Sequence, residues 1–138
     1  MKRYMALDIG DRTVGIAVSD LLGLTAQGVE TIRRTTLERD LARLSELIEQ
    51  YEVDELVSGL PKNMDGTEGE RCQIVHDFMA EVTKLYPSLP VHFWDERLST
   101  VAATRSLIEA DVSRRKRKKV IDKMAAVFIL QGWLDSLN

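Results

Sequence analysis

The sequence predicts an α/β protein built on a mixed five-stranded sheet with helices on both faces. Residues 3–33 contain three short apolar stretches separated by polar turns, which is the pattern of a strand meander. From residue 35 onward, segments with helical spacing of apolar residues alternate with two further short strands. Strands separated by helices favour parallel pairing, whereas the first three strands favour antiparallel pairing.

The first three strands are expected at residues 3–9, 14–20 and 25–33. A short polar turn at residues 10–12 joins the first two as a hairpin. Gly15 and Ala17 are small, so we expect another element to approach the second strand closely.

Two helices follow, each with a capping-box pattern at its start. The first pairs Thr35 with Glu38, and the second pairs Thr67 with Glu70. Apolar residues at helical spacing mark the buried face of each. For the first helix these are Leu37, Leu41, Leu44, Leu47, Ile48 and Tyr51. For the second they are Cys72, Val75, Phe78, Met79, Val82 and Leu85.

The remaining elements alternate along the chain. "VDELVSGLP" predicts a fourth strand that stops at Pro61, and "VHFW" predicts a fifth that is followed by "DER". Ser99 or Thr100 can cap a helix running to about Ala110, with a phosphate contact as their second role. A last helix is expected from about Val120 to Leu137.

Composition indicates a globular protein rather than a disordered one. The 138 residues predict one domain, residues 1–138, with a single core. Hydrophobic residues make up 44% and charged residues 30% of the chain. No apolar run could span a bilayer, no signal peptide is evident, and a single cysteine cannot form an internal disulfide. These features predict the cytoplasm and no membrane partner.

Three acids occupy positions where carboxylates can meet at one edge of the sheet: Asp8 inside the first strand, Glu96 after the fifth, and Asp122 opening the last helix. Carboxylates sharing a cleft repel one another, and divalent cations such as Mg²⁺ remove that penalty. Each acid also has an ordinary alternative role. Asp8 could hydrogen-bond the turn at residues 10–13, Glu96 could pair with Arg97, and Asp122 could be only a charge at a helix N-terminus.

Basic residues supply the nucleic-acid signal. The run "RRKRKK" contains Arg114, Arg115, Lys116, Arg117, Lys118 and Lys119, although the net charge of the chain is −3. It could draw a polyanion toward Asp122, or be only a solvated loop. In "GLPKNMDGTEG", Lys62 and Asn63 could contact phosphates, with Asp65 as a lesser metal-ligand candidate. Arg97 could clamp a phosphate or pair with Asp95 or Glu96.

Four segments together resemble the YqgF/RuvX family over essentially the whole chain: "ALDIGDRTVGIAVSD", "GLPKNMDGTEG", "DERLST" and "IDKMAAVFILQGWL". The resemblance implies an RNase H-like fold with strand order 3-2-1-4-5. It also implies a nuclease that matures the 5′ end of pre-16S ribosomal RNA or resolves Holliday junctions. By motif it carries the catalytic and metal-binding roles to Asp8, Glu96 and Asp122, with Mg²⁺ or Mn²⁺ as cofactor.

Two departures from the related RuvC resolvases concern the acids. Those proteins have an acid at the end of the fourth strand, whereas this strand ends in "SGLP", so that role falls to Glu96. They also carry two acids on the last helix, and here only Asp122 is found. The number of metal ions, one or two, stays open.

The expected partner is pre-ribosomal RNA or branched DNA, bound by a monomer or weak homodimer. Two other functions are compatible with the sequence. "DIGDRTVGIAVSD" also resembles the first phosphate-binding hairpin of the sugar-kinase, Hsp70 and actin ATPases, but those need two such domains. A nucleic-acid-binding or ribosome-assembly factor with a degenerate site is the other. Cys72, His76 and His92 are expected to be non-catalytic.

Overall fold

The computed structural model describes residues 2–98 and 114–137, and within the last helix it describes side chains from residue 124 onward. In chain order the elements are β1 (Tyr4–Ile9), β2 (Thr13–Ser19), β3 (Ala26–Arg33), α1 (Leu37–Gln50), β4 (Glu55–Leu60), α2 (Glu70–Leu85), β5 (Val91–Asp95), the short 3-10 helix η1 (Glu96–Leu98) and α4 (Arg114–Ser136). All five predicted strands are confirmed, with ends that shift by one or two residues.

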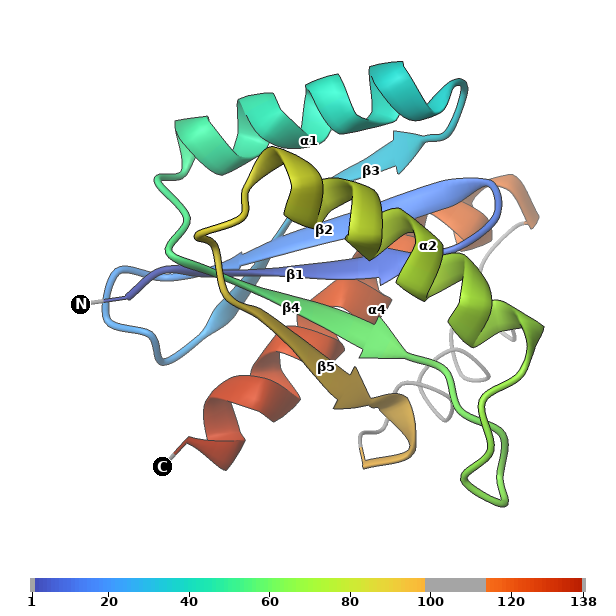
Figure 1. Ribbon diagram of the computed structural model, residues 1–138. Helices are drawn as coiled ribbons and strands as arrows, with labels where there is room; N and C mark the ends of the chain where they lie inside the picture. Colours follow the sequence, from blue (N-terminus) through green and yellow to red (C-terminus); the bar gives the residue numbers. More distant parts are fainter. Residues whose placement is uncertain (1, 99–113, 138) are drawn as a thin grey trace.

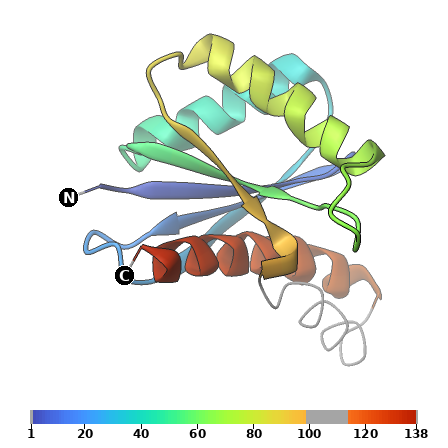
Figure 2. The ribbon, with the colours of Figure 1, turned by 60° about the horizontal axis from the view of Figure 1, so that its bottom comes forward.

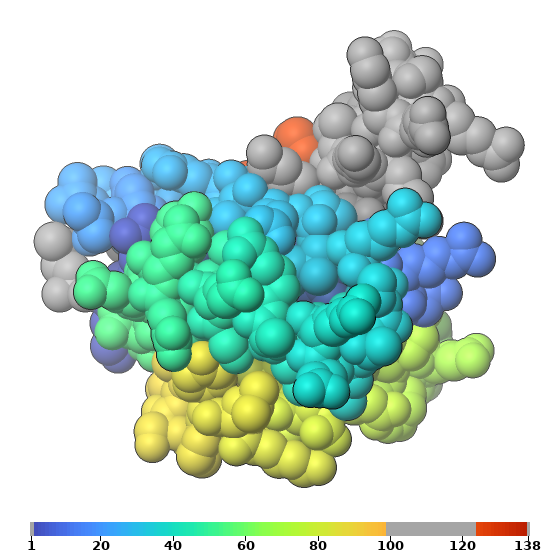
Figure 3. Space-filling model, turned by 90° about the horizontal axis from the view of Figure 1, so that it is seen from above, coloured from blue at the N-terminus to red at the C-terminus, as the bar shows by residue number. Residues whose placement is uncertain are grey.

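The strands form one sheet in the order β3-β2-β1-β4-β5. β2 is antiparallel to both β1 and β3, while β1, β4 and β5 run parallel. Helices α1 and α2 cover one face, and α4 crosses the other (Figures 1 and 2). Figure 3 views the molecule from the side of α1 and α2, which lie side by side. The predicted fold class and strand order are therefore confirmed.

The sheet separates two apolar clusters, whereas the sequence predicted a single core. Side chains of β1 alternate between them: Met5 and Leu7 pack under α1 and α2, and Ala6 packs under α4. On this side the sheet presents the small residues Ala6, Ala17 and Gly59, so α4 can lie close to it. Ala17 belongs to this cluster, which confirms the close approach expected at β2.

The two predicted capping boxes are wrong. The N-terminal cap of α1 is Thr36, whose Oγ1 accepts from the Arg39 N–H at 3.2 Å. Thr35 precedes the cap, and its backbone N–H donates to Asp40 Oδ1 at 3.0 Å. Gly69 caps α2 without a side-chain bond, because Thr67 bonds within the preceding loop instead.

The predicted buried faces of α1 and α2 are largely correct. Leu44, Leu47 and Ile48 of α1 are buried, as are the first five predicted residues of α2. The prediction that Leu85 is buried is wrong, because this residue lies at the end of α2 and is 53% exposed. Leu37, at the start of α1, is 42% exposed.

The last helix begins at Arg114, six residues earlier than predicted. The basic run therefore forms its first turns rather than a loop, because arginine and lysine are good helix formers and nothing in the run stops a helix. Asp122 consequently lies inside the helix rather than at its start. The helix predicted from Ser99 or Thr100 to about Ala110 falls outside the described residues. Within the described ranges, no helix combines the length and apolarity that crossing a membrane requires.

Candidate active site

Asp8 is a nearly buried carboxylate at the end of β1. Its side chain is on the face that α4 covers, because it follows Ala6 by two positions along the strand. The residue is 9% exposed, and a charge in that position is costly unless other groups stabilise it. The turn beyond it is closed by its own backbone, since the Gly10 N–H donates to the Thr13 carbonyl at 2.9 Å.

Glu96 reaches the same face from the end of β5. A Cβ placed on Gly59 of β4 would lie 3.4 Å from Glu96 Cδ, so the carboxyl group folds back over that glycine. Gly59 directly follows Ser58, which is paired with Leu7, the residue before Asp8. In a parallel pair the next positions are also neighbours, so Gly59 lies beside Asp8.

Asp8 and Glu96 therefore approach one face of the sheet from either side of a glycine. One strand separates β1 from β5, so their backbones lie about 10 Å apart. The absence of a side chain at Gly59 lets Ile129 of α4 and the Glu96 carboxyl group both lie close above β4. The sequence prediction that the ends of strands one and five lie near each other is confirmed.

The third predicted acid, Asp122, is described only as a position in α4. Ile129 of that helix packs over Gly59, and Trp133 contacts Tyr4 at the start of β1, with ring centroids 6.4 Å apart. Residue 122 precedes Ile129 by about two helical turns, which continue α4 away from Tyr4. Among the side chains that the structure describes, no three His, Cys, Asp or Glu residues are grouped to hold a metal ion.

Arg97 pairs with Asp95, one of the alternatives that the sequence left open. Its Nη2 donates to Asp95 Oδ2 at 2.7 Å, and its Nε donates to both carboxylate oxygens at 3.1 Å. These hydrogen bonds hold the pKa of the Asp95 carboxyl below its ordinary value. On the other side, Nη1 donates to the Met64 carbonyl at 3.3 Å.

The loop between β4 and α2 is held by its own side chains. Asn63 Nδ2 donates to Thr67 Oγ1 at 2.9 Å, and the Thr67 hydroxyl donates to Asp65 Oδ1 at 2.6 Å. These bonds from Thr67 lower the pKa of Asp65. Asp65 thus has a structural role in the turn. Lys62 is half-buried at the start of the loop.

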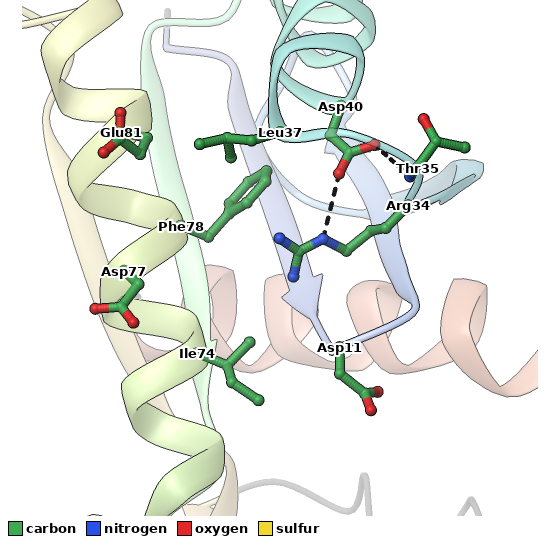
Figure 4. Close-up of a pocket in the computed structure, with 9 residues that line it drawn as sticks. All are labelled: Asp11, Arg34, Thr35, Leu37, Asp40, Ile74, Asp77, Phe78 and Glu81. Carbon is green, nitrogen blue, oxygen red and sulfur yellow. Dashed lines mark hydrogen bonds and ion pairs between the residues drawn. The ribbon is translucent and has the colours of Figure 1, made fainter.

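A pocket of about 490 Å³ lies on the opposite face of the sheet, between α1 and α2 (Figure 4). Arg34 crosses it, donating to Asp40 Oδ2 at 3.3 Å and to the Gly10 carbonyl at 2.7 Å. Its guanidinium lies over the Phe78 ring, 5.1 Å from the centroid. The pocket therefore lies on the opposite face of the sheet from Asp8 and Glu96. The bonds of Arg34 to Asp40 and Gly10 give that arginine a structural role in the pocket.

Both histidines have carboxylate partners. His92 Nε2 lies 2.7 Å from Glu55 Oε1, and its ring stacks on Trp133 with centroids 4.4 Å apart. His76 Nε2 lies 2.7 Å from Glu68 Oε1. Cys72 is buried, as expected of a core residue, and burial raises the pKa of its thiol. Sequence reasoning missed the Arg34–Asp40 and His92–Glu55 pairs, because no local pattern links residues on different elements.

The strand order, with the second strand antiparallel to its neighbours, defines an RNase H-like fold. Thermus thermophilus RuvC, solved with a Holliday junction substrate, has the same fold: TM-score 0.62, 13% identity, and 99% of this chain and 96% of that chain covered. The fowlpox virus Holliday junction resolvase aligns with a TM-score of 0.57 at 19% identity over 99% of both chains.

The chain belongs to the RuvX family, described as Holliday junction resolvase, which matches residues 2–136. A relative from Clostridioides difficile is 59% identical over 133 residues, covering 96% of this chain and 94% of its own. One from Desulforamulus reducens is 58% identical over 134 residues, covering 97% of both chains. Both carry the provisional name "pre-16S rRNA nuclease". The family resemblance predicted from four motifs is therefore confirmed.

Proposed function

We propose that this chain is a metal-dependent endonuclease that hydrolyses phosphodiester bonds in structured nucleic acid, with 5′-end maturation of pre-16S ribosomal RNA as its reaction. The observation that carries the proposal is the placement of Asp8 and Glu96 on one face of the sheet, with Gly59 between them. The provisional name of the relatives supports the choice of substrate.

The residues present suit a hard divalent cation. Asp8 and Glu96 offer carboxylate oxygens, the donors that Mg²⁺ and Mn²⁺ prefer, and the low exposure of Asp8 makes a compensating charge favourable. Asp122 joins them as third ligand on the basis of the family motif. When bound, such ions activate water and stabilise the leaving oxygen of a phosphodiester.

Basic residues position the substrate in this proposal. The six cations of the run Arg114–Lys119 occupy the first turns of α4, the helix that covers the face of Asp8. Phosphate contacts of this kind fix register without reading sequence. Lys62 and Asn63 lie in the loop beyond β4 and would contact the backbone of the same substrate. We expect a cytoplasmic enzyme that acts as a monomer or weak homodimer.

The test uses the purified full chain with two substrates, a pre-16S RNA fragment that keeps its 5′ extension and a four-way DNA junction. Cleavage is measured with Mg²⁺ or Mn²⁺ for the wild type, Asp8→Asn, Glu96→Gln and Asp122→Asn. We expect each substitution to reduce cleavage by at least about 100-fold, because each removes a proposed metal ligand.

Asp11→Asn is the matched control. Asp11 is an exposed acid only three residues from Asp8, and it lines the pocket on the opposite face. The Asp11→Asn variant should cleave both substrates at the wild-type rate. Full cleavage by Asp8→Asn would remove Asp8 from the mechanism, and tight binding without cleavage by the wild type would support a binding factor instead.

Junction resolution is the second candidate, favoured by the description of the family. A resolvase cuts two symmetric strands, which requires two active sites related by a twofold axis. Selective cleavage of the four-way junction by a dimer would favour this function. Cleavage of the RNA by a monomer would favour ribosomal RNA processing.

A further inference from the structure

We propose that Arg97 is a positioning residue: its guanidinium joins the turn at residues 63–67 to the end of β5 and thereby fixes the orientation of Glu96. The catalytic importance of that orientation rests on the proposed function. The joint itself rests on contacts between described residues, so the two parts can be tested separately.

The first contact closes a ring around Glu96. The Arg97 backbone N–H donates to Asp95 Oδ1 at 3.0 Å, and the Arg97 side chain donates to both oxygens of the same carboxylate. A planar fork paired with a carboxylate restricts direction as well as distance. Because residue 96 lies between these two partners, its backbone has little freedom to rotate.

The second contact reaches the loop between β4 and α2. Arg97 Nη1 donates to the Met64 carbonyl at 3.3 Å, and a Cβ added to Gly66 would lie 3.4 Å from the same nitrogen. Gly66 has a φ of +89°, a conformation that favours glycine. The turn therefore passes directly against the guanidinium.

The turn behaves as one unit because its ends are bonded to each other. The Gly66 N–H donates to the Asn63 carbonyl and the Asn63 N–H donates to the Thr67 carbonyl, both at 2.9 Å. Asn63 and Thr67 are also joined through their side chains. A nucleic acid that moves this turn would thus act, through Arg97, on the backbone that carries Glu96.

The geometry favours this role over a phosphate clamp. Asp95, only 17% exposed in its side chain, already neutralises the guanidinium, and a phosphate would have to compete with three side-chain hydrogen bonds. Lysine separates the two roles, because it keeps the positive charge but lacks the planar fork. A phosphate contact should largely survive Arg97→Lys, whereas the joint should not.

The experiment compares the full chain with Arg97→Lys and Arg97→Gln. Cleavage kinetics are measured on whichever substrate the wild type cuts, and amide hydrogen exchange is followed across residues 63–67. We expect both variants to lower kcat by about 100-fold, because Glu96 is displaced. KM should change by less than about threefold, because most proposed substrate contacts, Lys62 and the run Arg114–Lys119, lie outside the loosened turn. We also expect about tenfold faster exchange in the turn.

Arg71→Gln is the control, because Arg71 is an exposed arginine on α2; it should change neither readout. A wild-type kcat and unchanged exchange in Arg97→Lys, with a raised KM in Arg97→Gln, would overturn the proposal in favour of a phosphate contact. If the wild type cuts neither substrate, the proposed function fails. Amide hydrogen exchange then tests only whether Arg97 joins the turn to β5. Faster exchange in both variants supports this joint, and unchanged exchange refutes it.

Discussion

Replacing Gly59 by alanine tests how closely α4 packs on the sheet. The new Cβ would overlap Ile129 Cδ1 and lie 3.2 Å from Ile129 Cγ1, and Ile129 is fully buried. Overpacking a core costs about 1–3 kcal/mol, and the reduced freedom of alanine in the unfolded chain offsets about 0.4–1 kcal/mol. We therefore expect Gly59→Ala to lower the free energy of unfolding by about 1–2 kcal/mol.

A double-mutant cycle separates this overlap from other effects. Ile129→Val removes the overlapping methyl group and alone should cost about 1 kcal/mol. In the double variant the new Cβ occupies part of the space that valine leaves. We expect the double variant to be destabilised by about 1 kcal/mol or less, so the two substitutions should couple by at least about 1 kcal/mol.

The assay is urea unfolding monitored by circular dichroism. The variants should show the same dependence of unfolding free energy on urea concentration as the wild type. The same Cβ would make only an ordinary contact with Glu96, at 3.4 Å from Cδ, so the cost should come from Ile129 alone. A Gly59→Ala protein as stable as the wild type, or strictly additive losses, would refute the packing described for α4 on β4.

Two further predictions concern charge. Alanine at all six positions of the run Arg114–Lys119 should weaken nucleic-acid binding and flatten the plot of log K against log salt by up to about 4 units. A filter-binding series checks this, and an unchanged slope contradicts it; Arg71→Ala with Lys84→Ala on α2 is the control. The second prediction concerns Glu30, whose pKa Arg43 lowers from its ordinary value of 4.5. A carboxyl with a lowered folded pKa stabilises the fold above about pH 4.5 and loses that contribution as the pH falls through the folded value. The half-exposed pair should contribute about 0.5 kcal/mol, and Glu30→Gln should remove that part of the acid dependence of unfolding; an unchanged profile would contradict it.

The sheet was predictable because its signals are local. Alternating apolar residues define the strands, and helical spacing identifies faces such as Leu44 and Leu47 of α1. The caps were less predictable, since adjacent threonines offer two equivalent caps and the backbone bond from the Thr35 N–H to Asp40 forms only in the folded chain. A single core was expected because composition cannot show that a sheet divides its apolar residues between two faces.

The candidate site was predictable in part. The ends of β1 and β5 lie at one edge of the sheet as expected, one strand apart, because parallel strands place their carboxyl ends together. The role of Arg97 could not be chosen from sequence, since Asp95 and the turn at Met64 become its partners only in the folded chain. The membership of Asp122 stays a prediction from the family motif.

The face that holds Asp8 is completed by α4, which is translated more than a hundred residues after β1. Until α4 has been synthesised, Ala6, Ala17 and Val57 have no helix to pack against. If Asp8 acts as proposed, its site therefore takes its final form only after α4 has packed on the sheet.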